Sequence, residues 1–145
     1  MIPNLFSKKP LPKKLPADLE TDILELKKLK TKELCLKRAY NVITKKYVGK
    51  RVQTYTRLHQ LFIYDPKIIW KKKGFLHCTN QNYLIRILLV RSGKFSEKDI
   101  ELKLTHIWGS PHQYLRINLG NKTMDIDCWA KTFGVPYGQH MYGLC

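Results

Sequence analysis

Acidic residues are scarce in this 145-residue chain, which has eleven Asp and Glu against 27 Lys and Arg. The formal charge of +16 excludes a surface of balanced charge and predicts attraction to nucleic acid, anionic membranes or acidic protein. The basic residues are spread along the whole chain rather than gathered on one element. We therefore prefer a lysine-rich background composition as the explanation of the charge.

Long apolar runs are also missing, and no stretch is long enough to cross a bilayer. The first sixteen residues, MIPNLFSKKPLPKKLP, have no continuous apolar region and do not predict a secretory signal. The four cysteines lie far apart without a CxxC pair, which is too sparse for a disulfide framework; they are Cys35, Cys78, Cys128 and Cys145. These absences predict a reducing, cytoplasmic setting with free thiols.

The length and the 43% hydrophobic fraction predict one folded domain. Residues 1–16 contain four prolines and two Lys-Lys pairs, a composition that is typical of a segment unable to pack. We therefore expect a disordered, basic and proline-rich arm over 1–16 and a single domain over 17–145. We expect the protein to be a monomer.

The first half of the chain has helical periodicity. It predicts a helix from Ala17 to about Lys30, a second helix capped by Thr31 and stopped by Gly49, and a third amphipathic helix over 54–63. Residues 79–92 are apolar on nearly every side, which predicts a helix buried in the middle of the domain.

The second half changes to strand periodicity. Alternation in IELKLTHIW, HQYLRINL and KTMDID predicts three strands, with Gly120-Asn121 as a two-residue turn between the last two. The final FGVPYGQHMYGLC predicts an irregular loop. Helices followed by a small antiparallel sheet place the fold in the α+β class.

Cys78 stands just ahead of the predicted central helix, in GFLHCTNQNYLIRILLVRSG. The unpaired N–H groups and partial positive charge of a helix start stabilise a thiolate, and the Cys78 amide could donate to an oxyanion. We expect the polar Thr-Asn-Gln-Asn turn that follows to line a cleft. A free cysteine buried at a helix start explains this stretch equally well.

The register of the predicted hairpin supplies a base and an orienting group for that thiol. If Gly120-Asn121 is a two-residue turn, the numbers of cross-strand partners sum to 241. This register pairs Arg116 with Asp125 as an ion pair and places His112 diagonal to Asp127 on the same face. Taken alone, His112 reads as a surface histidine and Asp127 as a turn-capping carboxylate. Together with Cys78 they favour a catalytic site.

Other titratable residues give rival assignments. His106 in THIW is an alternative base, and Gln139-His140 is a further candidate for lining the cleft. A zinc site would have to draw on six scattered residues, of which only two are neighbours; they are His77, Cys78, His112, Cys128, His140 and Cys145. We therefore predict no metal and no cofactor.

The order of a helix-start cysteine, a histidine on a strand and an aspartate on the next strand resembles the transglutaminase-like superfamily, a branch of the papain-like cysteine enzymes. The similar stretches are KGFLHCTNQNYLIRILLVRSG and SPHQYLRINLGNKTMDIDCW, and the resemblance covers about residues 20–135. It implies a transglutaminase-like core in which Cys78 is the nucleophile, His112 the base and Asp127 the orienting carboxylate. It also implies acyl transfer on amides through a thioester.

Three positions depart from that family's pattern. Leu76 replaces a frequent Gly, Tyr114 a frequent Trp, and Cys128-Trp129 a frequent Pro-Thr. The departures bear on the substrate class more than on the triad. Three side chains are candidates for the oxyanion contact: Trp70, Gln60 and His77.

We expect hydrolysis of an amide or peptide bond in a protein or peptide substrate, including acidic ones. The alternative, from another class, is a non-catalytic basic module on the same fold that docks nucleic acid through its lysines.

Overall fold

The computed structural model describes residues 8–143. It confirms the α+β class. The helices are α1 (Ala17–Lys27), α2 (Lys32–Lys46), α3 (Arg51–Thr56), α4 (Pro66–Lys71) and α5 (Cys78–Arg91), with short 3-10 helices η1 (Leu58–Phe62), η2 (Glu97–Asp99) and η3 (Trp129–Phe133). The strands are β1 (Tyr47–Val48), β2 (Gly74–Phe75), β3 (Ile100–Ile107), β4 (Ser110–Asn118) and β5 (Thr123–Ile126).

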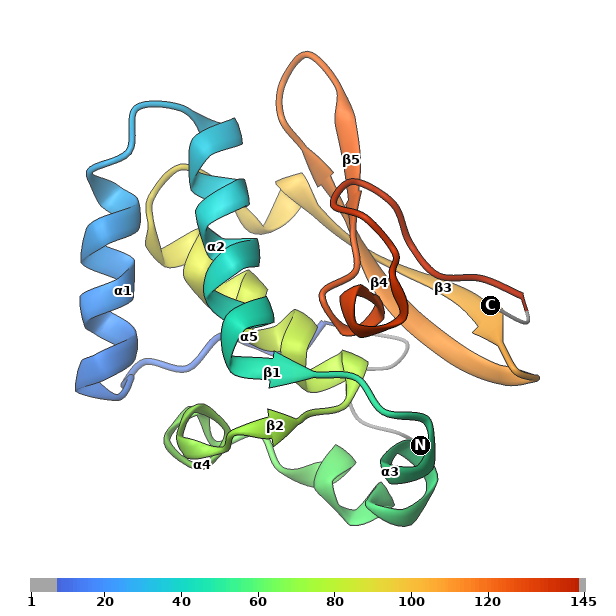
Figure 1. Cartoon of the computed structure of the whole chain (residues 1–145). Helices are drawn as coiled ribbons and strands as arrows, with labels where there is room; N and C mark the ends of the chain where they lie inside the picture. The colour runs from blue at the N-terminus through green and yellow to red at the C-terminus, as the bar shows by residue number, and fades with distance from the viewer. Residues whose placement is uncertain (1–7, 144–145) are drawn as a thin grey trace.

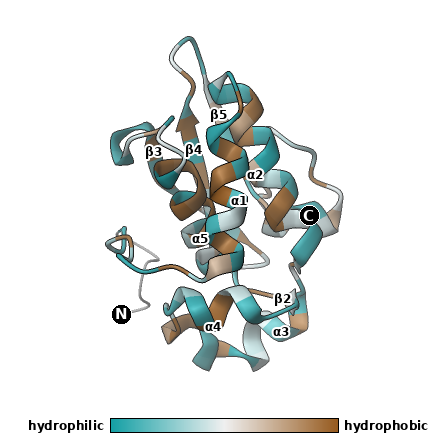
Figure 2. Cartoon of the chain, turned by 90° about the vertical axis from the view of Figure 1, so that its left-hand side faces the viewer, coloured by the Kyte–Doolittle hydropathy of each residue, from teal (hydrophilic) through white to brown (hydrophobic). Residues whose placement is uncertain are grey.

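Helix α5 forms the middle layer of the fold. It packs against α1 and α2 on one side and against β4 on the other, so the molecule is layered as helices, central helix and sheet (Figure 1). Hydrophobic residues concentrate where α1, α2 and α5 meet (Figure 2). The predicted central buried helix is confirmed: five of its apolar side chains have no exposed surface, namely Leu84, Ile85, Ile87, Leu88 and Leu89. No helix among residues 8–143 is long and apolar enough to cross a membrane.

The two N-terminal helices follow the sequence prediction closely. The Thr31 hydroxyl caps α2 by accepting a hydrogen bond of 3.1 Å from the Leu34 amide. Capping satisfies a backbone donor that has no partner within the helix. Helix α2 ends at Lys46, three residues before the predicted stop at Gly49.

The hairpin register is also confirmed. Leu115 faces Ile126 and Arg116 faces Asp125 in an antiparallel ladder. The Leu119 amide donates to the Lys122 carbonyl at 2.8 Å, which closes the two-residue turn at Gly120-Asn121. Strand β3 pairs with the other edge of β4, so β4 is the centre of the sheet.

The predicted helix over 54–63 is wrong. The chain forms α3 and η1 instead, and the two are separated at Arg57, whose backbone is not helical (φ −116°, ψ 37°). An amphipathic helix is stabilised mainly by burying its apolar face. Here only Leu61 is buried, while Tyr55, Leu58 and Phe62 are exposed.

Residues 8–16 differ from the predicted disordered arm, whose residues 1–7 lie outside the described range. Residues 8–16 contain no helix or strand, yet their carbonyls accept hydrogen bonds from α5. The buried guanidinium of Arg86 donates to the Lys9 carbonyl at 2.7 Å, and the Tyr83 hydroxyl donates to the Pro10 carbonyl at 3.2 Å. Polar groups buried on α5 need acceptors, and the arm supplies them.

Candidate active site

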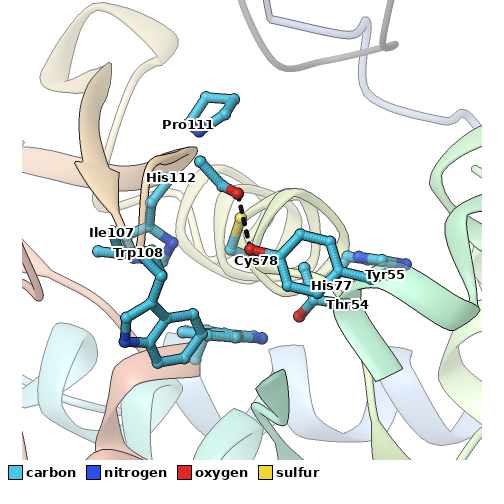
Figure 3. A pocket seen from close by; sticks show the side chains of 10 residues that line it. Thr54, Tyr55, His77, Cys78, Ile107, Trp108, Pro111 and His112 are labelled. Carbon is cyan, nitrogen blue, oxygen red and sulfur yellow. Dashed lines mark hydrogen bonds between the residues drawn. The ribbon is translucent and has the colours of Figure 1, made fainter. Parts of the chain in front are cut away.

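Cys78 is the first residue of α5 and lines a small cavity at the end of that helix. Its side chain is half-buried and faces the cavity together with His112 (Figure 3). No side chain caps the start of α5, so its first N–H groups remain directed towards this end of the helix. The predicted position of the thiol at a helix start is confirmed.

The polar turn after Cys78 does not line the cleft, contrary to the sequence prediction. All four side chains are buried, and three of them bind neighbouring backbone instead. Asn80 donates to the Gln60 carbonyl at 3.2 Å, Gln81 to the Leu76 carbonyl at 3.0 Å, and Asn82 to the Gln113 carbonyl at 3.1 Å. These bonds tie the first turn of α5 to η1, to the β2–α5 connection and to β4. They therefore hold the Cys78 backbone rigidly.

His112 lies on β4 beside both of its predicted partners. Its Nε2–H donates to Asp127 Oδ2 at 2.7 Å, and its ring lines the same cavity as the Cys78 thiol, with which it interacts electrostatically. Because Nε2 is engaged by Asp127, Nδ1 is the nitrogen available to the sulfur. The predicted spatial pairing of His112 with Asp127 is confirmed, and their catalytic role stays a prediction.

The electrostatics of this cluster favour a charged imidazole. Burial opposes the charge on His112, but the electrostatic interaction with Cys78 and the hydrogen bond to Asp127 outweigh it and raise the pKa of His112 to about 10. An imidazolium beside a thiol favours a thiolate–imidazolium pair. That pair is the reactive form of a cysteine nucleophile.

Asp127 is held by three donors. Besides His112 at Oδ2, the Met141 amide donates to the same oxygen at 3.0 Å and the Ala130 amide donates to Oδ1 at 3.2 Å. The carboxylate is 3% exposed, so these bonds replace the water that it loses on burial. The orientation of Asp127, and through it of the His112 ring, is therefore fixed by the residues that follow β5.

Two tryptophans that the sequence analysis did not select form one wall of the cavity. The Trp129 ring lies 5.2 Å from the His112 ring and 5.8 Å from the Trp108 ring, measured between centroids. Gly49 makes room for Trp129, since a Cβ there would lie 2.6 Å from Cδ2 of the indole. The need for glycine at position 49 therefore comes from this close approach rather than from stopping α2. No local sequence signal reveals a contact across 80 residues.

The cavity mouth is crossed by a hydrogen bond of 2.7 Å between the Tyr55 hydroxyl and the Ser110 hydroxyl. In Figure 3 this bond crosses in front of the Cys78 sulfur. The cavity has a volume of about 30 Å³, which is room for roughly one water molecule. With the Tyr55–Ser110 bond closed, the cavity is therefore too small for a peptide.

The three predicted oxyanion side chains have different fates. His77 is buried and lines the cavity, but its Nε2–H donates to the Arg57 carbonyl at 2.8 Å, and burial lowers its pKa. Neither Gln60 nor Trp70 lines the cavity. Trp70 lies on α4, and its indole packs against the Tyr47 ring, with the two ring centroids 6.4 Å apart. The structure thus places Gln60 and Trp70 outside the cavity, and the amide of Cys78 at the helix start is the donor that we retain for the oxyanion.

The rival histidines lie elsewhere. His106 is exposed on β3, and its carbonyl accepts a hydrogen bond from the Gly143 amide. The sequence suggested that His140 lines the cleft, but it does not line the cavity. It donates instead to Asp125 at 2.9 Å. Asp125 also binds Arg116 at 2.8 Å, which confirms the predicted ion pair.

The other described cysteines are poor nucleophiles. Burial raises the pKa of Cys35, whose thiol donates to Ser92 at 3.4 Å, and burial raises the pKa of Cys128 well above its ordinary value. Cys145 lies outside the described residues. Across residues 8–143, no three His, Cys, Asp or Glu side chains are grouped so that they could hold a metal ion.

The arrangement as a whole can perform nucleophilic chemistry at a carbonyl. A half-buried thiol at a helix start lies in one cavity with a buried imidazole, and that imidazole is oriented by a fixed carboxylate. Comparisons of the chain with protein-family models, with curated proteins and with solved structures find no match, so the chain is assigned to no family.

Proposed function

We propose that this protein is a cysteine hydrolase that cleaves an amide or peptide bond through a thioester on Cys78. The observation that carries the proposal is the continuous chain of contacts from the Cys78 thiol to the His112 ring and on to the Asp127 carboxylate at 2.7 Å. The transglutaminase-like core that the sequence resembles is part of the same proposal. It is supported by the order of these residues on a helix start, a central strand and the end of the next strand.

The proposed reaction has two halves. The Cys78 thiolate attacks the carbonyl carbon, and the Cys78 amide at the start of α5 donates to the developing oxyanion. The His112 imidazolium then gives its proton to the leaving amine as the C–N bond breaks, which leaves a thioester and a neutral imidazole. Water attacks the thioester with His112 as base. The acid product leaves, and the thiolate–imidazolium pair is restored.

Hydrolysis is preferred over amine cross-linking. Cross-linking requires a cleft that excludes water and admits a second amine substrate. The cavity at Cys78 has room for roughly one water molecule. Water is therefore the co-substrate that fits this site best.

The proposal is tested by incubating the protein with a mixture of synthetic peptides in water enriched in ¹⁸O. Wild type should release fragments that carry ¹⁸O in the new carboxylate, and Cys78→Ser should reduce their yield by at least about 1,000-fold. The matched control is Cys35→Ser, which changes a buried thiol that hydrogen-bonds Ser92, on the opposite side of α5 from the sheet. Cleavage that survives in Cys78→Ser would exclude the thiol mechanism.

Opening of the cavity mouth gives a second expected result. Tyr55→Phe removes the hydrogen bond to Ser110, which is worth about 0.5–1.5 kcal/mol between partly exposed groups. The open form should become more populated, so the second-order rate of peptide cleavage should rise by about 2-fold to 10-fold. Ser110→Ala should give the same increase, and the double variant should add nothing to it. A fall in rate with Tyr55→Phe would instead make this hydroxyl a substrate contact.

Nucleic-acid binding is a second candidate function. Lys45, Lys46 and Lys73 line one open depression, and the Lys46 ammonium lies 3.7 Å from the centroid of the Trp70 ring. Lysines gathered around an open depression attract the phosphate groups of nucleic acid. A binding module would show affinity for a labelled RNA 20-mer that falls steeply with salt and is unchanged by Cys78→Ala. The same binding without peptide cleavage would favour this alternative.

A further inference from the structure

The segment 138–143 runs along the sheet on the side of the candidate site (Figure 1). It is fixed at both ends by backbone pairing. Gly138 forms an antiparallel bridge with Asp125 on β5, and Gly143 forms a parallel bridge with Ile107 at the end of β3. The Trp108 amide donates to the Gly143 carbonyl at 2.9 Å. We call this segment, residues 138–143, the clamp segment.

The middle of the clamp segment touches the orienting carboxylate directly. The Met141 amide donates to Asp127 Oδ2 at 3.0 Å, and this is the oxygen that accepts the His112 Nε2–H at 2.7 Å. The Met141 side chain is 1% exposed and packs with Ile107 and Trp129 beside the cavity. The position of this one amide therefore restricts the orientation of the carboxylate towards the histidine.

His140 holds that amide in place. Its Nδ1–H donates to Asp125 Oδ2 at 2.9 Å, and its ring is stacked on Tyr114 with centroids 3.9 Å apart and an interplanar angle of 2°. Asp125 is itself fixed by Arg116, through bonds of 2.8 and 3.3 Å. His140 and Met141 are adjacent, so locking the ring of His140 between β4 and β5 restricts the Met141 amide.

From these contacts we propose that His140 is a positioning residue of the active site, acting through the Met141 amide on Asp127 and hence on the His112 ring. The inference rests on the proposed function, because it assigns the clamp segment to the same Cys78–His112–Asp127 site. His140 does not line the cavity. Its loss should loosen the catalytic geometry while leaving substrate binding intact.

The test compares three substitutions at this position. His140→Ala removes both the hydrogen bond and the stacking, and kcat should fall by about 10-fold to 100-fold with KM unchanged, as expected for misplacement of a catalytic group. His140→Asn places an amide N–H where Nδ1–H was and should retain activity to within about 3-fold of wild type. His140→Gln places its amide further from the backbone and should behave as His140→Ala. If kcat fell equally in all three variants and KM rose, the proposed positioning role of His140 would be contradicted.

A second readout needs no turnover, so it separates failure of this inference from failure of the proposed function. In wild type the Met141 amide proton should be protected from exchange by its bond to Asp127. His140→Ala should raise its exchange rate by at least about 10-fold, whereas Tyr137→Phe, a change outside the clamp segment that keeps the ring packed on Tyr40, should not. Unchanged Met141 exchange in His140→Ala would overturn the clamp even if the protein is an enzyme. Altered exchange without any peptide cleavage would leave the clamp standing and count against the hydrolase.

Discussion

Replacing His112 by alanine is expected to slow the alkylation of Cys78 by iodoacetamide at pH 6 by about 10-fold to 100-fold. In wild type the pKa of His112 is raised to about 10, so its imidazole is charged at pH 6 and should stabilise a thiolate on Cys78. A free cysteine is only about 0.3% ionised at pH 6. The lower intrinsic nucleophilicity of a stabilised thiolate reduces the expected ratio from several hundred to this range.

The sign of the pH dependence follows from the raised pKa of His112. The imidazolium persists from neutral pH up to about 10 and is lost as the pH rises through that value. Amide hydrolysis should therefore decline above about pH 10, because no proton remains for the leaving amine.

The matched control for the alkylation experiment is His106→Ala, which changes the exposed rival base on β3 and should leave the alkylation rate of Cys78 as in wild type. Equal rates in His112→Ala and wild type would remove His112 from the site.

Asp127→Asn is expected to reduce kcat by about 100-fold to 10,000-fold, as the loss of an orienting carboxylate does in triad enzymes. Asp127 accepts three hydrogen bonds, two at Oδ2 and one at Oδ1. An asparagine has one oxygen, so in either orientation its NH₂ group faces an N–H donor. With the NH₂ group at the Oδ2 position, His112 and the Met141 amide lose their acceptor. With the NH₂ group at the Oδ1 position, the Ala130 amide loses its acceptor. The pKa of His112 should fall because the charge and hydrogen bond of Asp127 both help to raise it.

This substitution also has a stability cost that must be separated from the catalytic one. Burying donors against each other costs about 1–3 kcal/mol in the free energy of unfolding, which urea denaturation would measure. The control is Asp99→Asn in the capping box of η2, which removes a carboxylate that accepts hydrogen bonds from Ser96 and does not line the cavity. Asp99→Asn should lower stability and leave kcat unchanged. A kcat for Asp127→Asn within about 3-fold of wild type would contradict the orienting role.

The His112–Asp127 contact could be predicted from the sequence because strand register is a counting problem. Once Gly120-Asn121 is taken as a two-residue turn, every cross-strand partner follows, including the Arg116–Asp125 pair. The length and apolar character of residues 79–92 predicted a helix that begins just after Cys78, and α5 begins at Cys78 itself. These features depend on residues that are close together along the chain or joined by one tight turn.

What the sequence could not predict depends on contacts between distant segments. The polar turn after Cys78 looked solvent-facing, yet its side chains are buried, and three of them satisfy backbone carbonyls on η1, the β2–α5 connection and β4. The helix over 54–63 has suitable periodicity but little buried surface, so it breaks at Arg57. The clamp segment has no periodic pattern, and only its bridges to β3 and β5 give it a fixed position.

The central claim is that Cys78 forms a thioester which His112 then helps water to hydrolyse, and p-nitrophenyl acetate tests it without knowledge of the natural substrate. Mixing it with a Cys145→Ser background variant should give a burst of about one nitrophenolate per protein molecule. Intact-mass and peptide mapping should locate a single acetyl group on Cys78. With His112 intact, this acetyl group should be lost after the burst as water hydrolyses the thioester. With His112→Ala in the same background it should persist, because deacylation then lacks a base. Acetyl groups on lysines alone, with Cys78 unmodified, would contradict the account.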